Sequence, residues 1–559
     1  MPVQPITSIP IQSPGFYGLN TADSPVGMSI SFAAIADHCV IDNFGRIGSR
    51  QGFQTLTTNP ETTYGDWPCQ RAWQFVDITG VPWQFSAAGG KLWDNNMGSG
   101  VATELIGYSG NQDENNWQMV SLGDTAYFIQ EFSKPHKFLP TDPDNVSLVD
   151  TAKGGSYPPP EIGYPSCACT GFGRLFMGGF ENNKGLIVYS DLNEGQELSF
   201  VGTIDVNQYW PNGTDVVTAI EIHNDFLIVF GQRSILVYGN PNGVADIYTI
   251  ELIDTLSNIG CIARDSVAAV GTDLLFLDAS GLRAFGRTVQ EKSMPVGNLS
   301  ANVKSDIEAA ITASTPADIV GFYNPEDSLY TLSFAEQALT YAFDTKLPLD
   351  NGTLKTTAWT NRYIRCGFRS ISGRTFYGGQ GGLYEYKGNV DLTRIDFGNS
   401  VQGFPYVAPG VKVKYLPNGD IDAYPIRFRY WTHTQTFEAP SKLKFLKEIE
   451  VVVVGGAGSE LFLKWRFNYS NPESSVGLTQ IGEELYYYDG QEKQAIDTTA
   501  WKDAYESAKY SGGAGIVASK QLKVWGSGRV VSIGFEANVV SNHFSVQEIN
   551  IQSLLGRTI

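Results

Sequence analysis

Short hydrophobic runs separated by tight turns recur along most of this 559-residue chain. The stretch LLFLDASGLRAFG, Leu274 to Gly286, shows the pattern: an apolar run, a turn of small and polar residues, and a second apolar run that ends in an aromatic residue. Because residues such as glycine, serine and asparagine supply the backbone freedom that a tight turn demands, this pattern predicts a β-hairpin.

The predicted hairpin returns with a regular period. Its second run ends in an aromatic residue at Trp93, Phe138, Tyr189, Tyr238, Phe285, Phe343 and Tyr386, and successive positions lie 43 to 58 residues apart. A period of roughly 40 to 50 residues is typical of propeller blades, each of which is a small four-stranded sheet. One hairpin cannot bury its apolar face alone, so packing blade against blade around a ring supplies the missing partner. We therefore predict a β-propeller of about seven blades over residues 61–397.

A β-sandwich with regularly spaced hairpins is the alternative to the propeller, although a sandwich does not need seven similar hairpins in a row. The longest gap in the period contains SANVKSDIEAAITAS. Val303, Ile307, Ala310 and Ile311 fall on one face at helical spacing there, and Ser300 could cap the helix. This stretch predicts a helix inserted between two repeat units.

The period disappears after Tyr386. Residues 398–559 contain alternating runs such as LFLKWRFNYS and QLKVWGSGRVVSIGFEANVV, which predict an antiparallel, sandwich-like β-domain. Residues 1–60 form a separate N-terminal segment, which we expect to contribute strands to the propeller or to subunit contacts. The predicted fold class is therefore all-β, as the 60 glycines and the 12% aromatic content also favour.

Charge and targeting signals narrow the functional classes. The formal net charge of -19 argues against a protein that grips nucleic acid over its whole surface, because phosphate binding depends on lysine and arginine. The N-terminal sequence lacks a basic region followed by an apolar one, and no stretch reaches the length needed to cross a bilayer. We expect folding in a cytoplasm and six cysteines that are reduced, buried thiols.

The search for catalytic and metal-binding chemistry yields no candidate. None of the five histidines has a partner at metal-ligand spacing. Cys167 and Cys169 would point to one face of a strand, but no second cysteine pair completes a metal site, which favours core packing. Propellers often carry glycosidases, yet no pair of carboxylates can be selected from the sequence. We therefore predict no catalytic residue, no cofactor, no metal and no enzymatic activity.

One basic cluster stands out against the acidic whole. It consists of Arg427, Arg429, Lys442, Lys444 and Lys447. Alternation along a strand would place Lys442 and Lys444 on one face, toward an anionic neighbour or a phosphate backbone. The alternative is a lysine-rich edge strand that keeps the protein soluble.

Motifs near both chain ends resemble a known family. The order GLN, DSP, a strand, Asp-x-x-Gly and Arg-x-Gly-Phe near the N-terminus, and TFEAPSKLKFLKEIEV and FSVQEINIQ near the C-terminus, are similar to the tail hub or nozzle proteins of short-tailed bacteriophages, also called packaged-DNA stabilisation proteins. The resemblance implies a homo-oligomeric ring, a hexamer, below the portal and the head-tail adaptor. It also implies a lower tail tube that carries a tail needle or tail fibres and closes the genome exit.

The sequence therefore predicts a structural virion protein, assembled in the host cytoplasm, that forms a tail nozzle. It would retain the packaged genome and let genomic DNA pass through an acidic lumen during ejection, without sequence-specific binding and without a membrane contact. The alternative prediction, from another class, is a propeller that binds or cleaves glycans. Fold alone does not separate the two.

Overall fold

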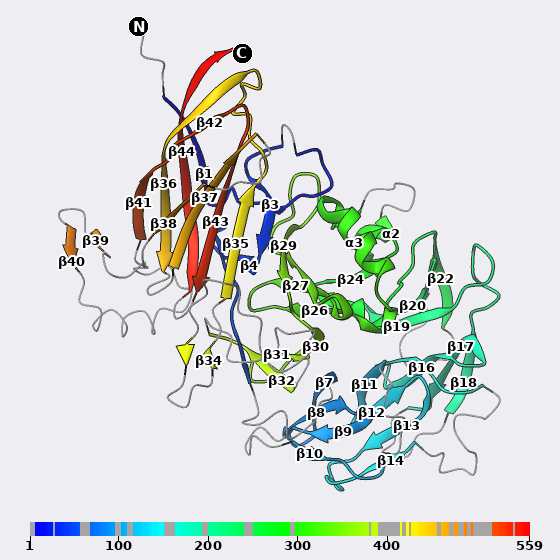
Figure 1. Cartoon of the computed structure of the whole chain (residues 1–559). Coiled ribbons are helices and arrows are strands. Elements are labelled where there is room, and N and C mark those ends of the chain that lie inside the picture. The colour runs from blue at the N-terminus through cyan, green and yellow to red at the C-terminus, as the bar shows by residue number, and fades with distance from the viewer. Residues whose placement is uncertain are drawn as a thin grey trace.

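The computed structural model of the chain describes residues 6–25, 28–55, 68–95, 102–108, 116–149, 162–192, 200–239, 250–290, 297–379, 382–388, 414–415, 421–423, 426–455, 460–468, 474–478, 486–488, 493–495, 517–539 and 543–558. Within these residues the chain is almost entirely β-structure (Figure 1). The all-β fold class is confirmed, with a β-propeller followed by a sheet domain.

Four consecutive four-stranded sheets follow one another along the first half of the propeller. They are β7 (Cys69–Val76), β8 (Pro82–Ala88), β9 (Lys91–Asp94) and β10 (Thr103–Glu104); β11 (Trp117–Leu122), β12 (Thr125–Gln130), β13 (Ser133–Phe138) and β14 (Val146–Leu148); β15 (Cys167–Gly171), β16 (Arg174–Phe180), β17 (Asn183–Ser190) and β18 (Phe200–Asp205); and β19 (Val217–His223), β20 (Phe226–Gly231), β21 (Ser234–Gly239) and β22 (Glu251–Ser257). Each is an antiparallel meander, as the repeat predicts.

Three further units complete the ring. They are β23 (Ala268–Val270), β24 (Asp273–Asp278) and β25 (Gly281–Ala284); β26 (Ile319–Asn324), β27 (Leu329–Phe334), β28 (Leu339–Asp344) and β29 (Lys355–Thr360); and β30 (Ile364–Arg369), β31 (Thr375–Gly379) and β32 (Gly382–Tyr386) joined by β6 (Phe53–Thr55). Among the described residues, six of the units are sheets of their own. The seventh, β26–β29, is one end of a ten-stranded sheet.

The hairpin in LLFLDASGLRAFG forms because its turn satisfies its own polar groups. Asp278 and Gly281 are the last paired residues of β24 and β25, and Gly281 takes a positive φ of 129°. The Asp278 carboxylate accepts hydrogen bonds from the backbone N–H and the hydroxyl of Ser280. One prediction fails here: Phe285 does not end the second strand but begins helix α2 (Phe285–Gln290), so this unit has three strands and a helix.

The predicted inserted helix is confirmed. The 3₁₀ turn η3 (Ala301–Val303) leads into α3 (Lys304–Thr312), which buries Ile307 and Ala310. The predicted cap is wrong, because the Ser300 hydroxyl accepts a hydrogen bond from the backbone N–H of Leu282 instead of an N–H of the helix. In the described residues no helix is long and apolar enough to cross a membrane.

An N-terminal strand closes the ring. β6 pairs antiparallel with β32, with Phe53 opposite Tyr386. The ring of Phe53 is fully buried, and its centroid lies 5.7 Å from that of Tyr377 and 5.4 Å from that of Tyr386. The last unit of the ring therefore contains strands from both ends of the propeller sequence, so the ring cannot open without breaking this pairing.

A second N-terminal stretch joins the propeller to the C-terminal domain. The ten-stranded sheet runs in the order β26, β27, β28, β29, β2, β3, β35, β43, β37 and β38. Its strands outside the propeller are β2 (Gly18–Leu19), β3 (Phe32–Asp37), β35 (Ile426–Thr432), β43 (Val531–Val539), β37 (Glu460–Phe467) and β38 (Ser474–Leu478). β2 and β3 lie between a propeller blade and the C-terminal strands (Figure 1).

The C-terminal domain packs this sheet against a second, seven-stranded one. The second sheet contains β1 (Ile6–Gln12), β4 (Cys39–Ile41), β5 (Ile47–Ser49), β36 (Lys442–Gly455), β41 (Val517–Lys523), β42 (Ser527–Gly528) and β44 (Phe544–Thr558). Phe428 and Tyr430 of one sheet share a hydrophobic core with Ile449 and Ile551 of the other. β33 (Lys414–Tyr415), β34 (Ile421–Ala423), β39 (Tyr486–Tyr488) and β40 (Lys493–Ala495) form two small hairpins beside it.

Both chain ends lie in this domain, where β1 pairs with β44 along seven residues (Figure 1). The domain is therefore built from the start and the end of the sequence together. The boundaries predicted at residues 60 and 397 lie outside the described residues and stay predictions.

Replacing Phe53 tests the closure of the ring. Phe53→Ala removes a fully buried ring from the β6–β32 pairing, and we expect it to lower the free energy of unfolding by about 3–5 kcal/mol. Phe132→Ala is the matched control because Phe132 is 56% exposed, and we expect a change within about 0.5 kcal/mol. Chemical denaturation followed by fluorescence measures both. Equal effects of the two substitutions would show that β6 does not hold the ring.

Candidate functional site

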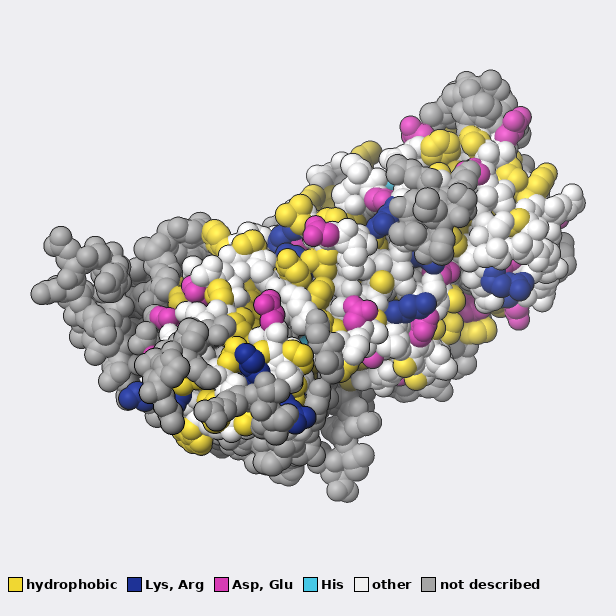
Figure 2. Space-filling model, turned by 90° about the horizontal axis from the view of Figure 1, so that it is seen from above, with side chains coloured by type: hydrophobic (Ala, Val, Ile, Leu, Met, Phe, Trp, Pro, Cys, Tyr) yellow, Lys and Arg dark blue, Asp and Glu magenta, His cyan; other side chains and the backbone are white. Residues whose placement is uncertain are grey.

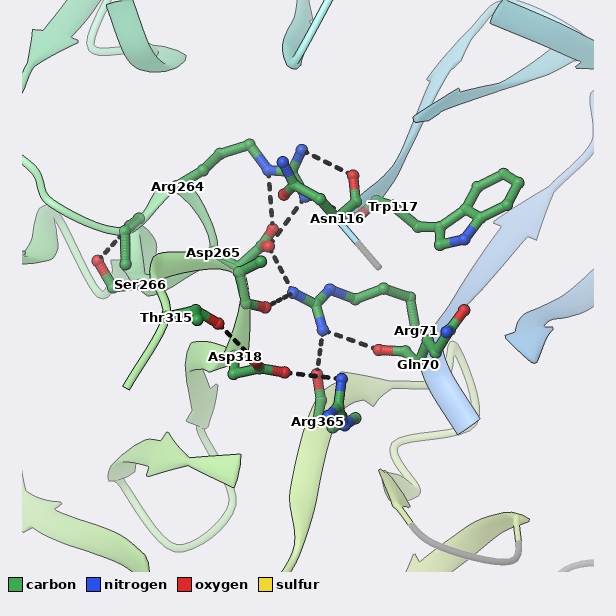
Figure 3. A network of polar contacts seen from close by, with 12 residues as sticks. Gln70, Arg71, Asn116, Trp117, Arg264, Asp265, Ser266, Thr315, Asp318 and Arg365 are labelled. Carbon is green, nitrogen blue, oxygen red and sulfur yellow. Dashed lines mark hydrogen bonds and ion pairs between the residues drawn. The ribbon is translucent and has the colours of Figure 1, made fainter. Parts of the chain in front are cut away.

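The propeller axis carries a dense group of charged side chains. The first strand of each unit lies innermost, and neighbouring first strands contact one another, as β7 does with β11 and with β30. Two 3₁₀ turns reach the same region: η2 (Arg264–Ser266), which precedes β23, and η4 (Pro316–Asp318), which precedes β26. Side chains from η2, η4, β7 and β30 meet there (Figure 3).

Arg264 connects three segments across the axis. Its guanidinium donates hydrogen bonds to the carbonyl oxygens of Asn116 at 3.2 Å, Trp117 at 2.7 Å and Ser166 at 2.5 Å. The same group holds the carboxylate of Asp265 at 2.9 and 3.1 Å (Figure 3). These carbonyls lie at the entry to β11 and β15, on inner strand edges, so Arg264 satisfies acceptors that the sheets leave unpaired.

Arg71 of β7 also binds backbone carbonyls of other segments, and it contacts Asp265 from the side opposite Arg264. Its guanidinium donates to the carbonyl oxygens of Arg365 at 2.6 Å and Ala317 at 2.8 Å, and it pairs with Asp265 at 2.7 Å. Asp265 therefore lies between two guanidinium groups (Figure 3). Burial alone would raise the pKa of Asp265, but the charges and hydrogen bonds of Arg264 and Arg71 hold it below its usual value.

A second ion pair extends the network toward β30. Arg365 lies 2.7 Å from the carboxylate of Asp318, which also accepts a hydrogen bond from the hydroxyl of Thr315. Three arginines thus face the carboxylates of Asp265 and Asp318, and further donors of Arg71 and Arg264 bind backbone carbonyls. This axial network, Arg71, Arg264, Asp265, Asp318 and Arg365, joins several blades of the ring through ion pairs and hydrogen bonds.

Glu221 on β19 is a carboxyl group whose pKa lies above its usual value. Burial raises the pKa of Glu221 to about 7, although a hydrogen bond from the backbone N–H of Ile222 opposes the shift. A general acid requires a raised pKa, but a carboxyl group that is buried without any catalytic role also has one. A glycosidase needs a second carboxylate about 5–9.5 Å away. The pKa of Glu221 carries no contribution from another carboxylate.

The predicted basic cluster divides between two sheets. Arg427 and Arg429 lie on β35, where Glu536 of β43 faces them at 3.8 and 3.6 Å. Lys464 of β37 approaches the same carboxylate to 2.9 Å. These four residues form the basic face of the ten-stranded sheet. Three cations surround one carboxylate, which leaves an excess of positive charge.

The three lysines lie on β36 of the other sheet. Lys442 and Lys447 are exposed, whereas Lys444 is fully buried. The Lys444 ammonium donates hydrogen bonds to the carbonyl oxygens of Ala439, Lys442 and Arg529, and burial lowers its pKa. Lys442 and Lys444 therefore do not offer one basic surface to a partner, because Lys442 is exposed whereas the Lys444 side chain is enclosed by the protein. Lys444 is therefore part of the interior.

Two members of the basic face are absent from the predicted cluster. Lys464 lies in the alternating run LFLKWRF, in which Lys464 and Arg466 fall on the same side of the strand, and this alternation was the available signal. Glu536 carries no such signal, because its role depends on the pairing of β43 with both β35 and β37. Among the described residues on the face shown in Figure 2, basic side chains lie singly between acidic and hydrophobic ones.

The six cysteines are all free and buried. In the described residues, no three or more His, Cys, Asp or Glu side chains gather where they could hold a metal ion.

These features define a β-propeller with a sandwich-like C-terminal domain. No family model and no curated protein matches the chain. Among solved structures, the WD40 β-propeller domain of Doa1 is similar at 12% identity and a TM-score of 0.37, covering 60% of this chain and 96% of that one. The Pan2 WD40 domain of Neurospora crassa is 8% identical with a TM-score of 0.36, and the match covers 64% of this chain and 99% of that one. YCF48 from Cyanidioschyzon merolae is 13% identical with a TM-score of 0.34, and the match covers 57% of this chain and 95% of that one. The fold of this chain is therefore defined by its own strand pairing.

Removing Arg264 tests the axial network. Arg264→Ala leaves three inner carbonyls without donors and Asp265 with one guanidinium fewer, so we expect a loss of about 3–5 kcal/mol in the free energy of unfolding. Lys91→Ala breaks an exposed ion pair with Glu104 and should cost about 0–1 kcal/mol. Denaturant titration compares the two. A similar small loss in both would mean that the network contributes little to the ring.

The raised pKa of Glu221 predicts a pH-dependent stability. The folded protein binds this proton more tightly than the unfolded chain, so the contribution is complete below pH 4.5 and is lost as the pH rises to about 7. Between pH 4.5 and pH 8 the parent protein should therefore lose about 3 kcal/mol of unfolding free energy that the Glu221→Gln variant does not lose. Glu251→Gln, an exposed change on β22, should show the same loss as the parent. Denaturation curves at both pH values measure the free energy of unfolding of the parent and the two variants. The same pH dependence in Glu221→Gln and Glu251→Gln would contradict the shifted pKa of Glu221.

Proposed function

We propose that this chain is a structural protein of a virion: the tail nozzle of a short-tailed bacteriophage. The observation that carries the proposal is the continuous ten-stranded sheet, which makes the propeller and the C-terminal domain one framework. The sequence resemblance at both chain ends supplies the family. A framework of this kind suits a wall element that bears load, and it needs no catalytic group.

The state of the propeller axis supports a structural role. Ligand sites of propellers gather around the central channel, but here the charged side chains of the axial network bind one another and backbone carbonyls. Asp265 is held ionised between Arg71 and Arg264, and Asp318 is paired with Arg365. These two carboxylates are committed to ion pairs within the fold, which is unlike the proton donor of a glycosidase.

The dimensions of the C-terminal domain fit a tube wall. β36 and β44 contain 14 and 15 residues and pair along most of their length. At a rise of about 3.3 Å per residue, each spans roughly 45–50 Å. Such strands, repeated in a homo-oligomeric ring, would line a conduit between the head-tail adaptor and the tail needle or tail fibres.

The proposed mechanism for DNA is electrostatic. The net charge of -19 makes the protein repel phosphates on average, so genomic DNA in the lumen would be retained by the closed exit and would slide without adhesion on ejection. Tight and steeply salt-dependent binding of duplex DNA by the isolated protein would contradict this mechanism.

The basic face fits an acidic protein neighbour in that ring. Arg427 and Arg429 are 46% and 32% exposed at their side chains, and both lie beyond hydrogen-bond distance from Glu536. Other copies of this acidic chain, or the adaptor, would supply the carboxylates. A glycan-directed propeller is the second candidate, and the raised pKa of Glu221 is the observation that favours it.

Assembly tests the proposed function. The purified protein should form rings in negative-stain images and a hexamer by sedimentation, alone or with its adaptor. The double change Arg427→Glu and Arg429→Glu should weaken ring formation at least tenfold in protein concentration, because it reverses the charge offered to an acidic neighbour. Lys304→Glu is the control, since Lys304 is exposed on α3 and away from that face.

Two results would overturn the proposal. One is a protein that stays monomeric at every concentration and with every neighbour. The other is turnover of a glycan that Glu221→Gln abolishes while the variant remains folded, which would establish the glycan-directed alternative.

A further inference from the structure

Two cysteines meet where the ring closes. Cys69 lies on β7, the first strand of the first blade, and Cys366 lies on β30, the first strand of the ring-closing unit. These two strands contact each other, although the cysteines are far apart in the sequence. Both side chains are buried, at 0% and 3% exposure, and both thiols are free.

The two sulfur atoms share one small space above Gly378 of β31. A Cβ atom at Gly378 would lie 2.4 Å from the sulfur of Cys366 and 2.8 Å from that of Cys69. One point is therefore within contact of both sulfurs, which makes them direct neighbours. Glycine is required there because any side chain would collide with both thiols.

The surroundings make the two thiols chemically unequal. Burial opposes ionisation of Cys366, but a hydrogen bond from Cys69, the charge of Arg71 and backbone N–H groups of Gly378 and Ala72 lower its pKa. The pKa of Cys69 is raised, first by its interaction with the Cys366 thiol and then by burial. Two sulfur atoms in contact, one of them beside the positive charge of Arg71, form an arrangement that thiol oxidation uses.

We propose that Cys69 and Cys366 are a redox-active dithiol that a peroxide oxidises to a disulfide across the ring closure. The Cys366 thiolate attacks one peroxide oxygen and becomes a sulfenic acid, and the other oxygen leaves as water after taking a proton. The Cys69 sulfur then attacks the Cys366 sulfur, forms the S–S bond and releases the second water. The two thiols lose two electrons, which the O–O bond of the peroxide accepts.

The disulfide would lock the propeller. The same strand junction is otherwise held by non-covalent contacts, such as the hydrogen bond from Arg71 to the carbonyl oxygen of Arg365. A covalent bond between β7 and β30 closes a loop that contains almost the whole propeller. Long closed loops restrict the unfolded chain most, so the oxidised form should resist unfolding more than the reduced form.

Cys167 and Cys169 provide an internal control. They are also buried and free, but both lie on β15, two residues apart. Side chains at such positions point the same way from one strand, with β-carbons too far apart for an unstrained disulfide. Oxidation of the folded protein should therefore leave this pair as thiols.

The experiment uses the full-length wild-type protein and hydrogen peroxide. The folded protein is oxidised, alkylated without reduction, digested and mapped by mass spectrometry. We expect one bridged peptide pair containing Cys69 and Cys366, a fall from six titratable thiols to four, and a melting temperature that rises by several degrees and returns with a reductant.

The Cys366→Ser variant should show no rise in melting temperature on oxidation, whereas Cys169→Ser should keep it. If Cys366→Ser fails to fold, the wild-type map decides alone. Six unchanged thiols, a bridge between other cysteines, or oxidation of Cys366 beyond the sulfenic acid without a bridge would each overturn the proposal.

Discussion

The pairing of two N-terminal strands determines how this molecule is built. β2 and β3 lie between β29 of the propeller and β35 of the C-terminal domain, and their backbone hydrogen bonds make one ten-stranded sheet of parts that would otherwise be separate. Without them, both β29 and β35 would present open edges to solvent, which sheets avoid. The relative position of the two domains therefore follows from sheet geometry and does not depend on a flexible linker.

The interior of the ring is held by a different kind of interaction. Hydrophobic clusters fill the spaces between blades, while the axis is polar because the inner strands leave backbone carbonyls without partners. Arginine suits this place, since one guanidinium reaches several acceptors in one plane. Arg264 and Arg71 each combine carbonyl contacts with an ion pair to Asp265, so the charge is compensated where it is buried.

These two features together explain why the proposed role is mechanical. Charged groups at the axis take part in ion pairs that hold the blades, and the C-terminal strands form a long framework of two packed sheets. The excess positive charge sits on the ten-stranded sheet, around Glu536, in a protein that is acidic overall. A surface of that kind directs association with acidic partners and sets their orientation more than it adds raw affinity.

The sequence alone determined the repeat, because hairpin periodicity and turn residues are local properties. The all-β class and the helix at Ile307 and Ala310 follow from the same local patterns. Tertiary structure decided the rest. Phe285 begins a helix, the Lys444 side chain is buried against the carbonyl oxygen of Arg529, and Cys69 meets Cys366, because these outcomes depend on contacts between segments distant in sequence. The axial network also escaped prediction, since Arg71, Asp265 and Arg365 come from separate repeats and converge only when the ring closes.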